Sequence, residues 1–182
     1  MPVAAMRILA LLVLVVAVAH APGPAVGAQG RTQTTRLTAL EAAVVREINR
    51  VRTARHLEPL RAAPSLRTAA LSHSKAMLEL GFFSHDSADG TSFSERIERY
   101  YTSRGWRSWS VGETLLASSG RQTAAATVVS SWLGSPPHRE IVLSRSFRDV
   151  GIGALYTRAA PHEFGDTETI AVTADFGLRT GR

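Results

Sequence analysis

The runs Val150-Gly151-Ile152-Gly153-Ala154-Leu155-Tyr156 and Thr169-Ile170-Ala171-Val172-Thr173-Ala174-Asp175-Phe176 decide the fold of this chain. Both are rich in the apolar and β-branched residues that favour strands. The residues between them include Pro161 and Gly165, which suit the loop of a hairpin. The two runs therefore predict neighbouring antiparallel strands near the C-terminus.

Helical patterns fill most of the sequence before these strands. Apolar residues recur at three- and four-residue spacings from Leu37 to Val51, and Thr38-Ala39-Leu40-Glu41 has the form of a capping box. Because helices come first and strands late, we expect an α+β fold with an antiparallel sheet. The further predicted elements are a helix from Pro64-Ser65 to a stop at Gly81, a short helix after the capping box Ser92-Phe93-Ser94-Glu95, an extended segment at 111–117, and a helix from Thr123 that breaks at Pro136-Pro137.

The first 28 residues have the layout of a secretory signal peptide. Arg7 precedes an unbroken apolar run from Ile8 to Ala19, and Pro, Gly and small residues follow. The run is shorter than the roughly 20 residues of a membrane-spanning helix, which favours cleavage, after Ala28 or Ala21, over a permanent anchor. We therefore expect a signal peptide at residues 1–28, a disordered leader at 29–36, and one secreted domain at 37–180 with no integral membrane segment after cleavage.

The composition excludes several classes of exported protein. The chain has no cysteine, so disulfide scaffolds and thiolate metal sites are excluded. Its formal net charge is +6, and Lys75 is its only lysine. The arginines form no cluster with interleaved aromatic residues, so we expect no nucleic-acid partner. A basic exported surface is instead suited to anionic wall polymers or lipid head groups.

Three polar residues are candidates for a functional site. His85 follows Gly81-Phe82-Phe83-Ser84 at a predicted helix end, His138 follows Pro136-Pro137, and Glu113 lies between them in an apolar stretch. Two imidazoles and a carboxylate can share protons or bind a divalent metal such as Zn²⁺, with His85 and His138 as candidate ligands. The sequence alone leaves open whether the three converge. It also leaves open whether Glu113 faces solvent or is buried with a partner.

Other catalytic motifs are absent from the sequence. It contains no His-Glu-x-x-His, no Gly-x-Ser-x-Gly elbow and no phosphate-binding loop. Gly151-Ile152-Gly153 is not a dinucleotide fingerprint, and its glycines indicate a strand that another backbone approaches closely. His73 lies in the apolar stripe of its helix, where a hydrogen-bonded core histidine is expected rather than a ligand.

These segments together resemble the CAP superfamily, also called the SCP/PR-1-like family, and most closely its bacterial, cysteine-free branch. The likeness covers roughly residues 37–177. Trp132-Leu133-Gly134-Ser135-Pro136-Pro137-His138-Arg139 is similar to the family's Trp-x-x-Ser-Pro-x-His-Arg. Five further segments resemble other signatures of the family, in the same order along the chain. They are Ile48-Asn49-Arg50-Val51-Arg52 with Pro59-Leu60, Phe82-Phe83-Ser84-His85, Gly112-Glu113-Thr114, Val150-Gly151-Ile152-Gly153 and Asp175-Phe176-Gly177.

The resemblance implies a three-layer α-β-α sandwich with a central antiparallel sheet and a cleft lined by His85, Glu113 and His138. Family members with the full site carry a second Glu where this chain has Ser135. Thr114 and Ile141 stand where the family has Asn, so two amides that would orient the loops are lost. These departures count against a shared catalytic mechanism.

Three functions are compatible with this pattern. The leading hypothesis is a secreted CAP-domain protein whose cleft binds a metal, a lipid or sterol, or a cell-wall component. The second is a metal- or His/Glu-dependent extracellular hydrolase, with Glu113 as general base and the two histidines holding zinc or polarising the substrate. The third is a non-catalytic interaction scaffold whose polar residues only satisfy one another. A fold hosts functions without specifying them, and we expect binding rather than catalysis.

Overall fold

The computed structural model describes residues 32–181. The predicted signal peptide and the first part of the predicted leader lie outside these residues. Within them, no helix is long and apolar enough to cross a membrane. The elements are helices α1 (Thr38–Thr53), α2 (Pro64–Leu80), α3 (Phe93–Glu98), α4 (Ala125–Gly134) and α5 (Pro136–Val142), the 3-10 helix η1 (His162–Phe164), and strands β1 (Thr34–Arg36), β2 (Arg61–Ala62), β3 (Ser108–Ser119), β4 (Asp149–Ala160) and β5 (Thr167–Thr180).

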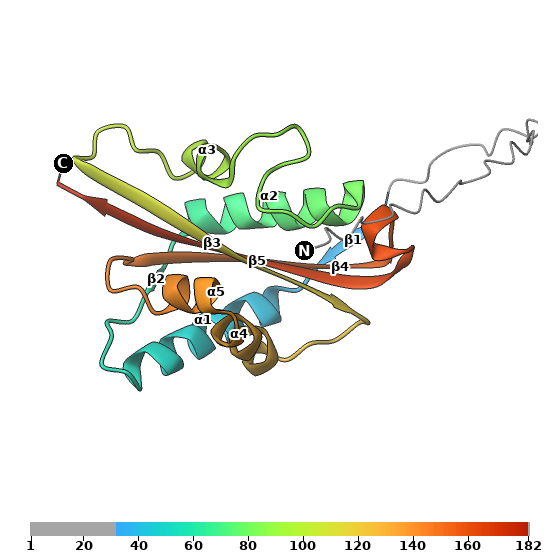
Figure 1. Cartoon of the computed structure of the whole chain (residues 1–182), viewed down its shortest axis with the longest axis horizontal. Helices are drawn as coiled ribbons and strands as arrows, with labels where there is room; N and C mark the ends of the chain where they lie inside the picture. The colour runs from blue at the N-terminus through green and yellow to red at the C-terminus, as the bar shows by residue number, and fades with distance from the viewer. Residues whose placement is uncertain (1–31, 182) are drawn as a thin grey trace, which may run out of the picture. The chain divides into compact units, whose positions relative to one another are not determined.

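The strands form one sheet with helices on both of its faces. The strand order is β1-β4-β5-β3, with antiparallel pairing throughout, and the two-residue β2 adds a short parallel pair beside β4. Helices α2 and α3 lie on one face, and α1, α4 and α5 lie on the other (Figure 1). The predicted three-layer α-β-α sandwich with a central antiparallel sheet is confirmed.

The register of the sheet determines which side chains share a face. Strands β4 and β5 pair around η1, which confirms the predicted hairpin. Strand β3 pairs with β5 along its whole length, so the extended segment is longer than the predicted 111–117. Glu113 lies opposite Asp175, and Asp175 lies opposite Gly151. Because directly opposite side chains point to the same face, Glu113 and Asp175 both lie on the face covered by α2.

Two glycines allow α2 to lie directly on β4. A Cβ at Gly151 would be 2.0 Å from the backbone nitrogen of Arg67, and one at Gly153 would be 2.3 Å from that of Leu71. Ser74 of α2 adds a buried hydrogen bond, in which its hydroxyl donates to the carbonyl of Gly153 at 2.9 Å. The close backbone approach predicted from these glycines is therefore present.

The opposite face of the sheet carries the main apolar core. Trp132 of α4 is buried there, and its indole nitrogen donates to the carbonyl of Leu115 at 2.9 Å. Because the chain has no cysteine, the fold depends on apolar burial of this kind, worth roughly 25 cal/mol per Å². The strand residues that pack beneath α1 and α4 are Val150, Ile152, Ala154, Val172, Ala174 and Phe176.

Most helix ends follow local signals in the sequence. Helix α2 begins at Pro64 and stops at Gly81, whose φ of 67° is left-handed. Ser92 caps α3 in a reciprocal capping box with Glu95. A helix break at Ser135 separates α4 from α5, so the Pro136-Pro137 segment begins a new helix. These positions agree with the predictions.

The start of α1 differs from its prediction. The N-cap is Leu37, which makes no side-chain cap, so the predicted Thr38–Glu41 capping box is wrong. Glu41 instead accepts a hydrogen bond from Nε of Arg36 at 2.8 Å. Arg36 belongs to residues 34–36, for which the sequence predicts a disordered leader and which instead form β1 against residues 155–157 of β4. Pairing with a distant strand, rather than a local cap, thus fixes this end of the helix.

Candidate functional site

Glu113 is buried in the edge strand β3 and has two partners. Its side chain is only 1% exposed. Oε1 lies 2.9 Å from Nδ1 of His85, and Oε2 accepts a hydrogen bond from Nη2 of Arg96. An ionised carboxylate only accepts, so Nδ1 of His85 carries the proton in this contact. Of the two possibilities that the sequence leaves open for Glu113, burial with a partner is the one observed.

Arg96 and His73 hold the loop that carries His85. Arg96 is buried in α3, and its Nη1 donates to the carbonyl of His85 at 2.9 Å and to the hydroxyl of Ser87 at 3.1 Å. Nε2 of His73 donates to the carbonyl of Ser84 at 2.8 Å. His73 is therefore the hydrogen-bonded core histidine that its position predicts. The backbone on both sides of His85 is fixed by buried side chains.

His138 reaches the cluster from the other side of the sheet. It lies in the first turn of α5, whereas His85 packs beside α3. Because β3 is an edge strand, the two rings can meet around that edge, and their centroids are 6.1 Å apart. The ring of Phe93 packs edge-on against His85 at 6.2 Å. The three predicted residues thus lie together, although the sequence places them on separate elements.

His85 is the most accessible member of the cluster. Its side chain is 47% exposed, in contrast to its buried partner Glu113. Nδ1 is directed at the carboxylate, and no residue within 32–181 bonds Nε2. His138 is half-buried beside it. The cluster therefore presents two imidazoles at the surface, supported from beneath by the Glu113–Arg96 ion pair.

The surroundings of Glu113 and Asp175 shift the pKa values of these two neighbouring carboxyl groups in opposite directions. Burial by itself would raise the pKa of Glu113, but the hydrogen bond from His85 and the charge of Arg96 outweigh it and lower the pKa. Burial raises the pKa of Asp175 well above its usual value, and the negative charge of Glu113 raises it further. Neither oxygen of Asp175 has a donor among the described residues. Asp175 therefore keeps its proton to a higher pH than Glu113 does, and its protonated form has an O–H to donate.

The imidazoles are also affected by their surroundings. Burial lowers the pKa of His138, and the neighbouring His85 lowers it further. Burial likewise lowers the pKa of His73. His138 is therefore neutral near pH 7 and offers a lone pair to a proton donor or a metal.

The donor set limits the metal chemistry of the cluster. In the described part of the chain, no three His, Cys, Asp or Glu side chains are arranged to hold a metal ion. Both carboxylate oxygens of Glu113 are engaged by His85 and Arg96. A three-ligand zinc site of the catalytic type does not fit these residues. Only His85 and His138 remain as candidate ligands.

The positions that depart from the family pattern lie outside these contacts. Thr114 points to the face opposite Glu113, and its buried hydroxyl has no partner among residues 32–181. Ile141 packs on that same face, with a methyl group 3.2 Å from where a Cβ of Gly112 would lie. Ser135 is the residue between α4 and α5. None of the three replaces a contact of the His85–Glu113 pair.

Sequence reasoning missed Arg96, Asp175 and Phe93. A buried Glu113 requires a positive partner, but only the packing of α3 shows that Arg96 supplies it. Asp175 is the last residue but one of the apolar run 169–176, and only the β3–β5 register places it opposite Glu113. No local signal distinguishes Arg96 from a surface charge, whereas the apolar neighbours of Asp175 in the strand run were a signal that could have found it.

Comparison with known proteins agrees with this architecture. The family model described as CAP, the cysteine-rich secretory protein family, matches residues 45–172. The chain therefore belongs to the CAP family. Its lack of cysteine fits the bacterial branch of that family. No curated protein sequence matches the chain.

Three of the solved structures that share this fold are bacterial proteins. An outer surface protein from Borrelia burgdorferi has a TM-score of 0.62 at 20% identity, over 82% of this chain and 99% of its own. An extracellular SCP-domain protein from Bacillus anthracis has a TM-score of 0.59 at 22% identity, over 76% of this chain and 40% of its own. A Staphylococcus aureus cysteine-rich secretory protein gives 0.51 at 14%, over 76% of this chain and 38% of its own. The chain thus spans about two fifths of the Bacillus and Staphylococcus proteins, and the likeness concerns the fold alone.

Proposed function

We propose that this protein is a secreted CAP-domain protein that binds a ligand at the cluster of His85, Glu113 and His138, without turning it over. The observation that carries the proposal is the partly exposed side chain of His85, whose Nδ1 is fixed by a buried carboxylate and whose ring lies beside that of His138. Such a pair suits a polar group of a lipid, sterol or cell-wall molecule, or a divalent metal held by two imidazoles. The extracellular and outer-surface descriptions of similar structures support secretion.

The state of Glu113 favours binding over hydrolysis. A general base needs a pKa near the working pH and access to the proton that it removes. Glu113 is buried, its pKa is lowered, and both of its oxygens accept hydrogen bonds already. Its role in the proposal is to orient His85 through Nδ1, as a carboxylate orients an imidazole in many sites.

The exposure of the two histidines favours binding over a purely structural role. In a scaffold, the polar residues would satisfy one another and leave nothing for a ligand. Here His138 makes no hydrogen bond to Glu113 or Arg96, and almost half of the His85 side chain is exposed.

The metal form of the proposal is tested by titrating the purified protein with Zn²⁺ in a calorimeter. We expect His85→Ala and His138→Ala each to weaken zinc binding about tenfold or more. Even the loss of a residue that only hydrogen-bonds to a metal ligand lowers metal affinity by about that factor. His162→Asn is the matched control, because His162 is exposed, lies outside the cluster and has a positive φ that Asn tolerates. Equal zinc uptake by all four proteins would exclude the metal site.

The organic form is tested by thermal shift with wall fragments, lipid vesicles and sterols, again beside the two alanine variants. A bound ligand raises the melting temperature of the wild type and not of the variants. If no compound shifts any of them, the scaffold function stands instead. Hydrolysis of a peptide or wall fragment that His85→Ala abolishes would establish the hydrolase.

A further inference from the structure

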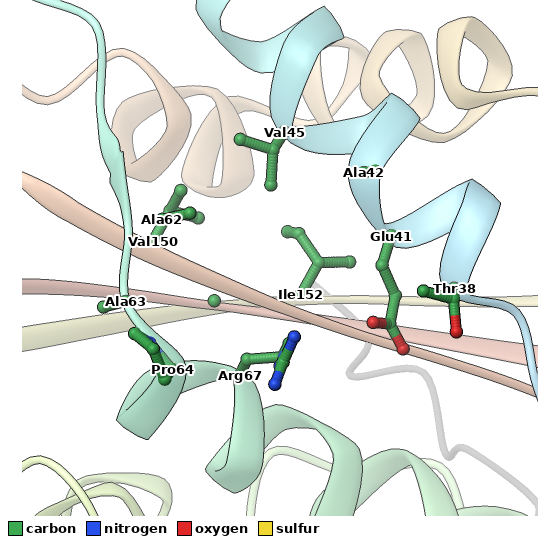
Figure 2. A pocket seen from close by; sticks show the side chains of 11 residues that line it. Thr38, Glu41, Ala42, Val45, Ala62, Ala63, Pro64, Arg67, Val150 and Ile152 are labelled. Atoms are coloured by element: carbon green, nitrogen blue, oxygen red, sulfur yellow. The ribbon is translucent and has the colours of Figure 1, made fainter.

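A second candidate site lies at the other edge of the sheet from the histidine cluster. Strand β1 pairs with residues 155–157 of β4, and β2 pairs with residues 149–150. The stretch between them has no neighbouring strand among the described residues. A pocket of about 300 Å³ opens there, between α1 and the start of α2 (Figure 2).

The backbone of Ile152 faces this pocket. Leu37 donates its backbone N–H to the carbonyl of Ala154 at 2.9 Å, and Ala63 donates to the carbonyl of Val150 at 2.9 Å. Backbone groups alternate in direction along a strand, so the N–H and C=O of Ile152 point the same way as those of residues 150 and 154. No residue within 32–181 bonds them on this side. The pocket therefore contains one donor and one acceptor at the spacing of a β-ladder.

The walls of the pocket are mainly apolar, and one positively charged side chain beside it makes no ion pair within residues 32–181. Figure 2 shows Arg67 from α2 and Glu41 from α1 projecting toward the space beside Ile152. Glu41 is already paired with Arg36. Arg67 is exposed and has no ion-pair partner in the described part of the chain. The apolar walls are formed by Ala42, Val45, Ala62, Ala63 and Pro64.

We propose that this pocket binds the C-terminal end of a short peptide as a one-residue strand between β1 and β2. The penultimate residue donates its N–H to the carbonyl of Ile152 and accepts from the N–H of Ile152. The terminal carboxylate lies against Arg67, and a small apolar side chain packs on the walls. Val150 and Ala154 lie four residues apart, which is roughly 13 Å along the strand. This gap leaves room for one peptide residue to pair with Ile152. A volume of about 300 Å³ is at the small end of ligand pockets, so the site holds about two residues.

The probe for this site is N-acetyl-alanyl-alanine, titrated into the ¹⁵N-labelled protein and followed by NMR. We expect a saturable shift of the Ile152 amide resonance. Methylating the first alanine nitrogen of the probe removes one hydrogen bond and should weaken binding about fivefold. Arg67→Gln should weaken the acid about tenfold and leave its C-terminal amide unchanged, since only the acid carries the charge.

Two control variants test whether the probe binds at this pocket and not elsewhere on the protein. Arg46→Gln removes an exposed charge from α1 that does not line the pocket, so the affinity for the probe should not change. His85→Ala should leave it unchanged as well, because the cluster lies at the β3 edge and the two sites are independent. An Ile152 resonance that stays fixed at millimolar probe would overturn the proposal. Equal binding of the N-methyl analogue, or of the acid to Arg67→Gln, would overturn it too.

Discussion

At the residue scale, the site is organised by one buried carboxylate. Glu113 neutralises Arg96 and fixes the tautomer of His85, and its charge adds to the effect of burial, which raises the pKa of Asp175. Arg96 in turn holds the carbonyl of His85. A change at Glu113 therefore acts on the fold and on the orientation of the imidazole together.

We expect Glu113→Ala to destabilise the protein by about 3–5 kcal/mol, because it leaves Arg96 as a buried and unpaired charge. Urea unfolding followed by circular dichroism gives the free energy. The control is Glu79→Ala, which breaks the partly exposed pair with Lys75 and should cost less than about 1 kcal/mol. Equal stabilities of wild type and Glu113→Ala would show that the acid is not buried as described.

Asp175→Asn should reveal the protonation state of the buried carboxyl pair. The folded-state pKa of Asp175 is raised, so its contribution to stability is complete below the unfolded value of 3.8 and is lost as pH rises through the folded value. Asn is neutral at every pH and keeps a donor for Glu113. We expect the variant to exceed wild type by about 1–3 kcal/mol at pH 8, with an advantage that shrinks as pH falls to 4. An advantage that grows toward acid pH would contradict the assignment.

At the element scale, the contact between α2 and β4 depends on two residues without side chains. We expect Gly153→Ala to cost about 1–3 kcal/mol or more, because its Cβ would lie 2.3 Å from a backbone nitrogen and 2.4 Å from a backbone carbon of α2. Gly134→Ala is the control, since a Cβ at Gly134 would have no atom within 4 Å and alanine favours the helix. Thermal and urea unfolding measure both. A Gly153→Ala protein as stable as Gly134→Ala would mean that the helix does not lie so close to the strand.

The elements that could be predicted from the sequence are those with local causes. Gly81 ends α2 through its left-handed conformation, and Ser92 caps α3 through its own side chain, so neighbouring residues suffice. Strand β1 could not be predicted, because its three residues are stabilised by pairing with β4 more than a hundred residues later. The capping box predicted at Thr38 is wrong for the same reason. Glu41 bonds to Arg36, whose position depends on the pairing of β1 with β4.

At the scale of the whole molecule, the site depends on the topology more than on its motifs. The family resemblance identifies His85, Glu113 and His138, but their meeting requires β3 to be the edge strand and α5 to lie on the opposite face from α3. Arg96 and Asp175 enter through the packing of α3 and the β3–β5 register. The spacing of residues along the chain predicts neither the packing of α3 nor the β3–β5 register.

The last prediction concerns the secretion that we propose, and it needs the whole chain. When the full sequence is expressed in a bacterial host with a secretory pathway, we expect the protein outside the cytoplasm with Gln29 or Pro22 as its first residue. Both cuts retain residues 34–36, so β1 can still pair with β4. Mass spectrometry of the exported protein identifies the N-terminus. Val13→Arg is the control, because a charge in the apolar run should keep the uncut chain inside the cell. An exported chain that retains residues 1–28 and partitions with the membrane would instead identify this segment as an anchor.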